Sequence, residues 1–277
     1  MIIQETVITS RQNPTVKWAA SLQDAKGREA SEAFLCEGEK LTFEAARASL
    51  TVTHIFVREG RRTEALSALG EHFSHARYRD TQLYVVSDDV MAKISTEKTP
   101  RDIISIIKYL DFFKELNIIY KEDFFSEDSG RMLALCSVRD PGNLGSVVRS
   151  AAAFGVKRLI LSHDCVDIYS PKVVRAAMGS LFHIEVCVVR DMAAFLTAAA
   201  EAGRRVLAAE LRPHAVPIAA AQLSEKDIVL IGNEGHGIPE ELSALCAQSV
   251  YIPIAEATES LNAAVAAAVF MFAQRGN

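Results

Sequence analysis

Residues 132–155 read MLALCSVRDPGNLGSVVRSAAAFG, and this stretch decides the fold of the second half of the chain. The apolar run 132–138 predicts a buried strand, and residues 143–154 predict a helix that Gly155 ends. A polar corner therefore joins a strand to a helix, with Asn143 at the corner and Arg149 on the helix.

The same alternation continues from this stretch to the C-terminus. The predicted strands are apolar throughout instead of alternating, which is expected of a parallel sheet with helices on both faces. The sequence therefore predicts an α/β domain. Further strands are expected at 156–161, 183–189, 205–211, 227–232 and 249–254, and further helices at 171–178, 192–202, 240–247 and 260–274.

A smaller α/β domain is expected at residues 1–110. Residues 111–130 end in a polar, turn-like segment and are predicted to be a linker, whose four phenylalanines suggest that it packs onto a domain. The larger domain would then span 131–277. In the first domain the pattern predicts a turn and helix within 10–32, a helix at 41–48, and strands at 34–36, 52–57 and 83–86.

The composition is that of a globular protein. The chain has 277 residues, of which 49% are hydrophobic and 23% charged, and this favours two domains of ordinary size. A net charge of −5 argues weakly against a generally basic nucleic-acid binder, since a local basic patch is compatible with an acidic total.

The cysteines and the apolar runs indicate where in the cell the protein is expected. Five scattered cysteines form no CxxC pair and no Cys/His ligand spacing, which favours free thiols in a reducing cytosol and no metal site. The N-terminus lacks the basic start and apolar core of a signal peptide, and the apolar run 263–273 is too short to span a bilayer. A cytoplasmic protein without a membrane segment is expected.

Three corners where a strand is followed by a helix carry the chemistry: Asn143–Arg149, Gly232–Gly237 and Ser260–Asn262. Ligands of open parallel sheets bind outside the carboxyl ends of the strands, and glycine lets the backbone approach a ligand closely. Each corner also has a purely structural interpretation. The glycines would only turn the chain, Arg149 would be a surface residue or pair with Glu234, and Ser260 would be an N-cap.

The glycine pattern at 232–237 excludes two common cofactor sites. It is neither the dinucleotide fingerprint nor the phosphate loop, so a nucleotide-dependent oxidoreductase is disfavoured. Asn262 lies in an alanine-rich helix, where asparagine is a poor helix former.

Taken together, the corners resemble the SpoU (TrmH-type) RNA 2′-O-ribose methyltransferases of the SPOUT superfamily. The motifs are Asn143-x-Gly145-x-x-x-Arg149 with Gly155, Ile231-Gly-Asn-Glu-Gly235 with Gly237, and Ile252-Pro253 followed by Ser260-Leu-Asn262. The segment Tyr169–Arg175 is also similar, although Ala177-Met178-Gly179 lacks a serine that members often have.

The first domain resembles the L30e-like substrate-binding domain of that family. The resemblance rests on Ser10–Pro14, Glu37-Gly38-Glu39, Ile94-Ser95 and Thr99-Pro100, with Arg101-Asp102 where Gln-Gly is frequent.

The resemblance implies a trefoil knot in the C-terminal domain, although true knots are very rare. It also implies a homodimer and S-adenosylmethionine as the cofactor. Gly232, Ile252 and Leu261 match positions that contact the cofactor in the family.

The same resemblance implies roles for the catalytic positions. Arg149 matches the arginine proposed as the base, but a guanidinium is normally protonated, so orienting the target phosphate is an alternative role. The positions that would place Arg149, the ribose or the cofactor are Asn143, Glu234, Ser260 and Asn262.

The expected function is therefore methyl transfer to a ribose 2′-hydroxyl of structured RNA. The extra N-terminal domain favours ribosomal RNA over transfer RNA, and an antibiotic-resistance methylase of ribosomal RNA is a further possibility. The alternative is a catalytically silent RNA-binding protein with the same two domains.

Overall fold

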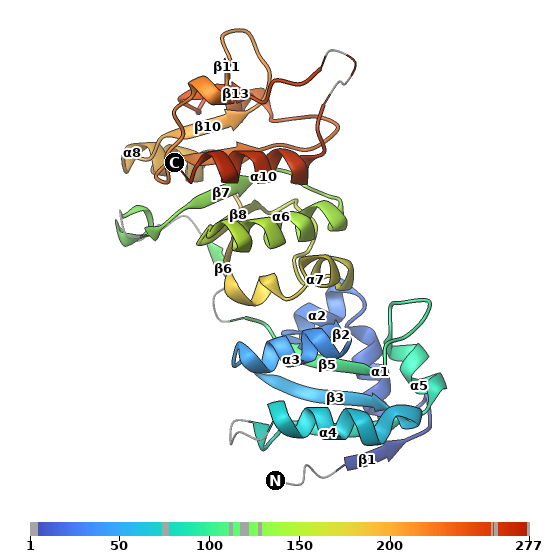
Figure 1. Ribbon diagram of the computed structural model, residues 1–277. Coiled ribbons are helices and arrows are strands. Elements are labelled where there is room, and N and C mark those ends of the chain that lie inside the picture. Colours follow the sequence, from blue (N-terminus) through green and yellow to red (C-terminus); the bar gives the residue numbers. More distant parts are fainter. Residues whose placement is uncertain are drawn as a thin grey trace. The chain divides into compact units, whose positions relative to one another are not determined.

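The computed structural model describes residues 5–73, 78–110, 113–116, 122–126, 129–255, 257 and 260–275 (Figure 1). The chain forms two compact units. The first unit comprises Met1–Leu110 together with Asp167–Phe182, and the second comprises Asp111–Val166 together with His183–Asn277.

The first unit is built on a mixed five-stranded sheet in the order β1-β4-β3-β5-β2. The pairs β1–β4 and β4–β3 are parallel, whereas β5 runs antiparallel to both β3 and β2. The strands are β1 Glu5–Ile8, β2 Ala33–Glu37, β3 Val52–Arg58, β4 Gln82–Val86 and β5 Ile103–Lys108. The helices are α1 Pro14–Ser21, α2 Ala25–Ser31, α3 Glu39–Arg47, α4 Arg62–His72, α5 Asp88–Ile94 and α7 Pro171–Ala177.

The helix predicted within 10–32 is wrong in one respect, because the structure divides it into α1 and α2. The chain turns so tightly at residues 22–24 that Gly27 lies against the backbone of Ser21. A Cβ at Gly27 would lie 2.0 Å from the Ser21 carbonyl oxygen. Helical periodicity did not reveal this break, because the apolar residues that predict the helix, Val16, Ala19 and Leu22, all come before α2.

Segment 167–182 joins the first unit through polar and aromatic contacts. Buried Arg28 donates to the carboxylate of Asp167 through Nε at 2.9 Å. The ring of Tyr169 stacks on Phe34 with a centroid distance of 4.7 Å. This segment lies between two strands of the second unit in sequence, so the chain passes between the units three times.

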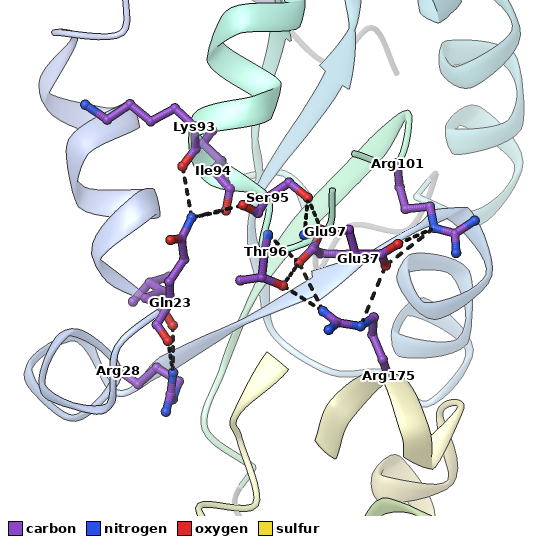
Figure 2. A network of polar contacts seen from close by, with 11 residues as sticks. Gln23, Arg28, Glu37, Lys93, Ile94, Ser95, Thr96, Glu97, Arg101 and Arg175 are labelled. Atoms are coloured by element: carbon purple, nitrogen blue, oxygen red, sulfur yellow. Dashed lines mark hydrogen bonds and ion pairs between the residues drawn. The ribbon is translucent and has the colours of Figure 1, made fainter. Parts of the chain in front are cut away.

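A buried carboxylate on β2 forms the centre of a polar network in the first unit (Figure 2). Glu37 accepts hydrogen bonds from the Ser95 hydroxyl at 2.5 Å and from the Thr96 backbone N–H at 3.0 Å. Arg175 on α7 pairs with Glu37 at 3.4 Å and donates to the Thr96 hydroxyl at 2.6 Å. The network therefore ties the sequence segments 37, 95–96 and 175 together.

The second unit is built on an eight-stranded parallel sheet in the order β11-β13-β10-β12-β7-β8-β9-β6, as far as the structure describes it. This confirms the predicted α/β fold with a parallel sheet. The strands are β6 Phe113–Leu116, β7 Met132–Leu135, β8 Arg158–Ser162, β9 Glu185–Val189, β10 Val206–Ala209, β11 Val216–Pro217, β12 Ile228–Ile231 and β13 Gln248–Tyr251. The helices are α6 Pro141–Phe154, α8 Met192–Glu201, α9 Glu240–Ser243 and α10 Ala263–Ala273.

Both faces of the central strands are buried. In β7, Met132 and Ala134 belong to the core that includes Phe195 of α8, while Leu133 and Leu135 point to the other face and are also fully buried. Helices α6 and α10 lie side by side on the second unit (Figure 1). The continuous apolar strands are thus explained by a sheet that is covered on both sides.

Part of the predicted linker 111–130 belongs to the sheet, because β6 pairs in parallel with β9. Phe125 is buried in the core of the second unit, and Phe124 contacts it edge-on at 5.1 Å between ring centroids. Residues 111–112, 117–121 and 127–128 lie outside the described residues, so the extent of the linker stays a prediction.

The five cysteines are all free, as the sequence predicts. Burial, together with the neighbouring Glu37, strongly raises the pKa of the Cys36 thiol. Within the described residues, no helix is long and apolar enough to cross a membrane, and no group of three or more His, Cys, Asp or Glu side chains is arranged to hold a metal ion.

Candidate functional site

The first corner is the start of helix α6. The helix begins at Pro141, two residues earlier than predicted, because proline is favoured in the first turn and Asp140 provides the N-cap. The Asp140 carboxylate accepts the backbone N–H of Asn143 at 2.8 Å. This cap fixes the backbone of Asn143 and leaves its side-chain amide available for other contacts.

A chain of side-chain hydrogen bonds joins the three corners. The Asn143 amide donates to the carboxylate of Glu234, and Asn262 Nδ2 donates to Asn143 Oδ1 at 2.8 Å. These residues are 91 and 119 positions from Asn143 in the sequence. The fold therefore brings the three predicted motifs into one polar contact.

At the third corner, the residue that caps the last helix is Asn262 and not Ser260. Asn262 is the N-cap of α10, and its Oδ1 accepts the N–H groups of Ala264 at 2.9 Å and Val265 at 3.3 Å. The interpretation of Ser260 as the N-cap is wrong, because the helix begins at Ala263. Asparagine is a poor helix former inside a helix but a good cap, which explains its presence before the alanine run.

The second corner is a tight loop after β12. Asn233 and Gly237 bond to each other through both backbones, at 2.8 and 3.1 Å. The Asn233 side chain accepts the Gly235 N–H at 2.8 Å and donates to the Ser137 carbonyl at 2.7 Å. The loop is thus fixed by its own hydrogen bonds and by a bond to the segment that follows β7.

Gly232 is required by this loop. A Cβ at position 232 would lie 2.5 Å from the carbonyl carbon of Gly237 and 2.7 Å from the nitrogen of Ile238. No side chain fits between these backbone segments. The structural interpretation of the glycines is therefore correct for Gly232, and for Gly237, whose φ of +68° favours glycine.

A cavity of about 520 Å³ lies at the carboxyl ends of β10, β12 and β13. Its lining includes all three residues assigned to cofactor contact, namely Gly232, Ile252 and Leu261. Glu234 and Ser260 also line it. The second and third corners thus form one concave site, at the edge of the sheet where parallel α/β proteins bind ligands.

The cavity also contains a carboxylate that the sequence analysis missed. Glu210 follows β10 directly and lines the cavity. Its carboxylate accepts from the Ser249 hydroxyl at 2.9 Å and pairs with Arg212 at 2.9 Å. Glu210 falls inside the strand predicted at 205–211, whereas β10 ends at Ala209 and leaves Glu210 just beyond its carboxyl end.

Arg149 is exposed on α6. The predicted alternative, an ion pair with Glu234, is wrong in this structure, because Glu234 accepts from Asn143. Among the described residues, nothing forms a hydrogen bond or ion pair with the Arg149 guanidinium. The cavity lining does not include Arg149, Asn143 or Asn262. Asn143 donates to Glu234, which does line the cavity, and Asn262 donates to Asn143.

Comparison with known proteins identifies the larger domain. Residues 130–272 match the model of the SpoU rRNA Methylase family, which is more than half of the chain. The chain belongs to the SpoU rRNA methylase family. This confirms the resemblance that rested on the three motifs, all of which lie inside the matched SpoU region. Residues 13–105 match the model of the MRM3-like substrate binding domain.

Relatives of similar length match this chain over both units. A 23S rRNA (guanosine(2553)-2′-O)-methyltransferase of Bacillus subtilis is 29% identical over 97% of this chain and 99% of its own. A 23S rRNA (uridine(2479)-2′-O)-methyltransferase of Streptomyces viridochromogenes is 27% identical over 96% and 90%. The AdoMet-bound structure of an rRNA methyltransferase from Sinorhizobium meliloti is 27% identical, covers 98% of this chain and 97% of its own, and has a TM-score of 0.80.

Proposed function

We propose that this protein transfers a methyl group from S-adenosylmethionine to a ribose 2′-hydroxyl of ribosomal RNA. The observation that carries the proposal is the cavity at the second and third corners, which is joined by hydrogen bonds to the first corner. The family match and the full-length relatives named as 23S rRNA 2′-O-methyltransferases supply the reaction and the class of RNA.

The cavity fits S-adenosylmethionine in size and charge. Its volume of about 520 Å³ lies in the range of small-molecule sites, roughly 300–1,000 Å³. The glycine backbone of 232 and the apolar side chains of Ile252 and Leu261 offer a close, dry surface for the cofactor. The carboxylate of Glu234 complements the sulfonium and ammonium groups of this ligand, whereas the charge of Glu210 is balanced by Arg212.

When bound, S-adenosylmethionine supplies a methyl group that its sulfonium has already activated. The protein must therefore orient the ribose and accept or relay a proton from the 2′-hydroxyl. In our proposal Arg149 binds and orients the phosphate of the target nucleotide, since a guanidinium donates in a planar fork and is normally always protonated. Asn143, Glu234 and Asn262 tie the start of the helix that carries Arg149 to the second and third corners.

The first unit would recognise the RNA. The match of 13–105 to a substrate-binding domain supports an L30e-like RNA-binding domain at 1–110, a linker within 111–130 and a SPOUT methyltransferase domain at 131–277. Ribosomal RNA is favoured over transfer RNA because both full-length 23S rRNA methyltransferases cover both domains. The proposed place of action is the cytoplasm.

A trefoil knot and a homodimer complete the proposal. After β13, near one edge of the sheet, the chain returns to place α10 against α6, the helix that follows the central strand β7. This return supports a knot that encloses the cofactor loops. Val265 and Phe272 of α10 are 50% and 66% exposed, and such exposed apolar residues favour a second copy as partner. Light scattering of the purified protein tests the dimer.

The experiment that tests the function measures transfer of labelled methyl groups from S-adenosylmethionine to unmodified 23S rRNA. Arg149→Ala should bind S-adenosylmethionine normally by calorimetry, yet lose at least about 100-fold in methyl transfer, the loss typical of a misplaced reactant. Lys157→Ala is the matched control, because it removes an exposed positive charge next to the amino end of β8, opposite the site.

Two outcomes would contradict parts of the proposal. Full activity of Arg149→Ala would remove the assigned role of the arginine. Failure of the wild-type protein to bind S-adenosylmethionine would instead favour the catalytically silent RNA-binding protein. Mapping 2′-O-methyl groups in total RNA with and without the gene would then identify the target nucleotide.

A further inference from the structure

Ser137 has an unusual backbone at the end of the central strand. It follows β7 by two residues and has a φ of +56°, in the left-handed region that non-glycine residues rarely adopt. A serine stays in this conformation only when the surrounding structure holds it there. The contacts of Ser137 therefore require an explanation beyond chain turning.

Ser137 is held at three points. Its N–H donates to Ser162 Oγ at 2.9 Å, its hydroxyl donates to Asp164 Oδ2 at 2.6 Å, and its carbonyl accepts from Asn233 Nδ2 at 2.7 Å. The second carboxylate oxygen of Asp164 accepts from Ser162 Oγ at 2.6 Å. Asp164 thus binds the Ser137 hydroxyl directly, and it also fixes the Ser162 hydroxyl that accepts the Ser137 N–H.

Asp164 is suited to this task because it is ionised. Partial burial by itself would raise the pKa of this carboxyl, but hydrogen bonds from Ser137, Ser162 and Arg139 outweigh it and lower the pKa below its usual value. A carboxylate with two oxygens as acceptors can hold both serine hydroxyls at once. Charge-assisted bonds of this kind are stronger than bonds between neutral groups.

Two connections link the backbone conformation of Ser137 to the site. Its carbonyl binds Asn233, whose side chain also fixes the loop that carries Glu234. Its chain continues for three residues to Asp140, the cap that starts α6. A change in the backbone conformation of Ser137 would therefore displace two of the three corners together.

We infer that Asp164 is a positioning residue for methyl transfer: it holds Ser137 in the left-handed conformation and so aims the Ser137 carbonyl at Asn233. This inference rests on the proposed function. Asp164 lies outside the three motifs and does not line the cavity, so it acts through Ser137 and does not contact the cofactor there.

The test compares Asp164→Ala and Asp164→Asn with Ser137→Gly and the double variant Ser137→Gly/Asp164→Ala. Asp164→Ala should lower kcat on unmodified 23S rRNA by about 10- to 100-fold, since displacement of about 1 Å in a site can cost 100-fold. Asp164→Asn, which keeps one acceptor oxygen, should lose less. Ser137→Gly should keep most of the activity, because glycine adopts positive φ without support.

The double variant gives the decisive comparison. If Asp164 acts by holding Ser137 at positive φ, glycine at 137 removes the need for it, and Ser137→Gly/Asp164→Ala should recover most of the kcat that Asp164→Ala loses. A merely structural carboxylate would not be rescued in this way. Additive losses in the double variant, or wild-type kcat per folded molecule in Asp164→Ala, would overturn the inference.

Controls separate this inference from folding and from the proposed function. Asp191→Ala removes a different hydrogen-bonded carboxylate, which accepts the Ala194 N–H at the start of α8, and should lower the melting temperature without changing kcat. Turnover is measured per molecule that binds S-adenosylmethionine by calorimetry. Absence of methyl transfer by the wild-type protein would count against the proposed function, whereas an active wild type with an unaffected Asp164→Ala counts only against Asp164.

Discussion

Replacing Gly232 by alanine is expected to damage both the stability of the second unit and the cofactor site. The added Cβ would lie 2.5 Å from the carbonyl carbon and 2.6 Å from the carbonyl oxygen of Gly237, and 2.7 Å from the nitrogen of Ile238. All three atoms belong to backbone, so no side-chain rotation relieves the contact. The loop 233–237 must move away from β12.

The magnitude follows from this overlap. Forcing one extra carbon into a well-packed position costs about 1–3 kcal/mol. The second unit has roughly 150 residues, for which 1 kcal/mol lowers the melting temperature by about 2–4 °C, so a decrease of about 2–12 °C is expected. Because Gly232 and Gly237 both line the cavity, the affinity for S-adenosylmethionine should fall at least about tenfold, which corresponds to 1.4 kcal/mol.

The measurements are thermal unfolding and calorimetric titration with S-adenosylmethionine. Gly235→Ala is the matched control in the same loop, because its nearest contact would be the Asn233 side-chain oxygen at 3.4 Å and its φ is not positive. This control should unfold and bind almost like the wild type. Equal effects of the two substitutions, or normal cofactor affinity in Gly232→Ala, would refute the reasoning.

Three further predictions use other contacts. Asp167→Ala leaves the buried Arg28 without its carboxylate partner and should lower the free energy of unfolding by about 1.5–3 kcal/mol in urea titrations. An unchanged free energy of unfolding would contradict a stabilising role of this ion pair. Asn262→Ser should retain the cap of α10, and hence the melting temperature, but lose methyl transfer through the missing bond to Asn143; equal activity would show that this bond is dispensable. Burial raises the pKa of the Cys36 thiol, so Cys36 should react with a thiol reagent at pH 8 only after the protein unfolds. Rapid reaction of Cys36 in the native protein would contradict this prediction.

Much of the fold was predictable because the second unit has strong local patterns. Its continuous apolar strands and intervening helices indicate a parallel sheet, which the structure confirms. In the first unit, the strand at Ile103–Lys108, which runs antiparallel between β3 and β2, was not predicted, although its apolar run is of the same kind as those that predicted strands in the second unit. Strand order depends on contacts that are far apart in sequence.

The candidate site was predictable as a set of positions but not as a network. The three motifs indicated which residues lie at strand ends, and the structure places Gly232, Ile252 and Leu261 around one cavity. The hydrogen bond that Asn262 donates to Asn143 depends on the return of α10 to α6. Local sequence patterns do not predict that α10 packs against α6. They therefore could not identify Asn262 as an N-cap that also bonds the third corner to the first.

The bonding in the site also bears on why position 149 is an arginine. Asn143 and Glu234 satisfy each other, and Asn262 divides its amide between the cap of α10 and Asn143. The described residues thus supply no anionic partner for the Arg149 guanidinium, and its neighbours Val147, Val148 and Ala151 are buried and apolar. Folding alone therefore gives no reason for a guanidinium at this position. This supports the proposal that Arg149 binds a phosphate of the RNA, which matches its charge and its fork of donors. In that proposal the amide network holds the three corners together, and Arg149, which is outside the network, binds the substrate.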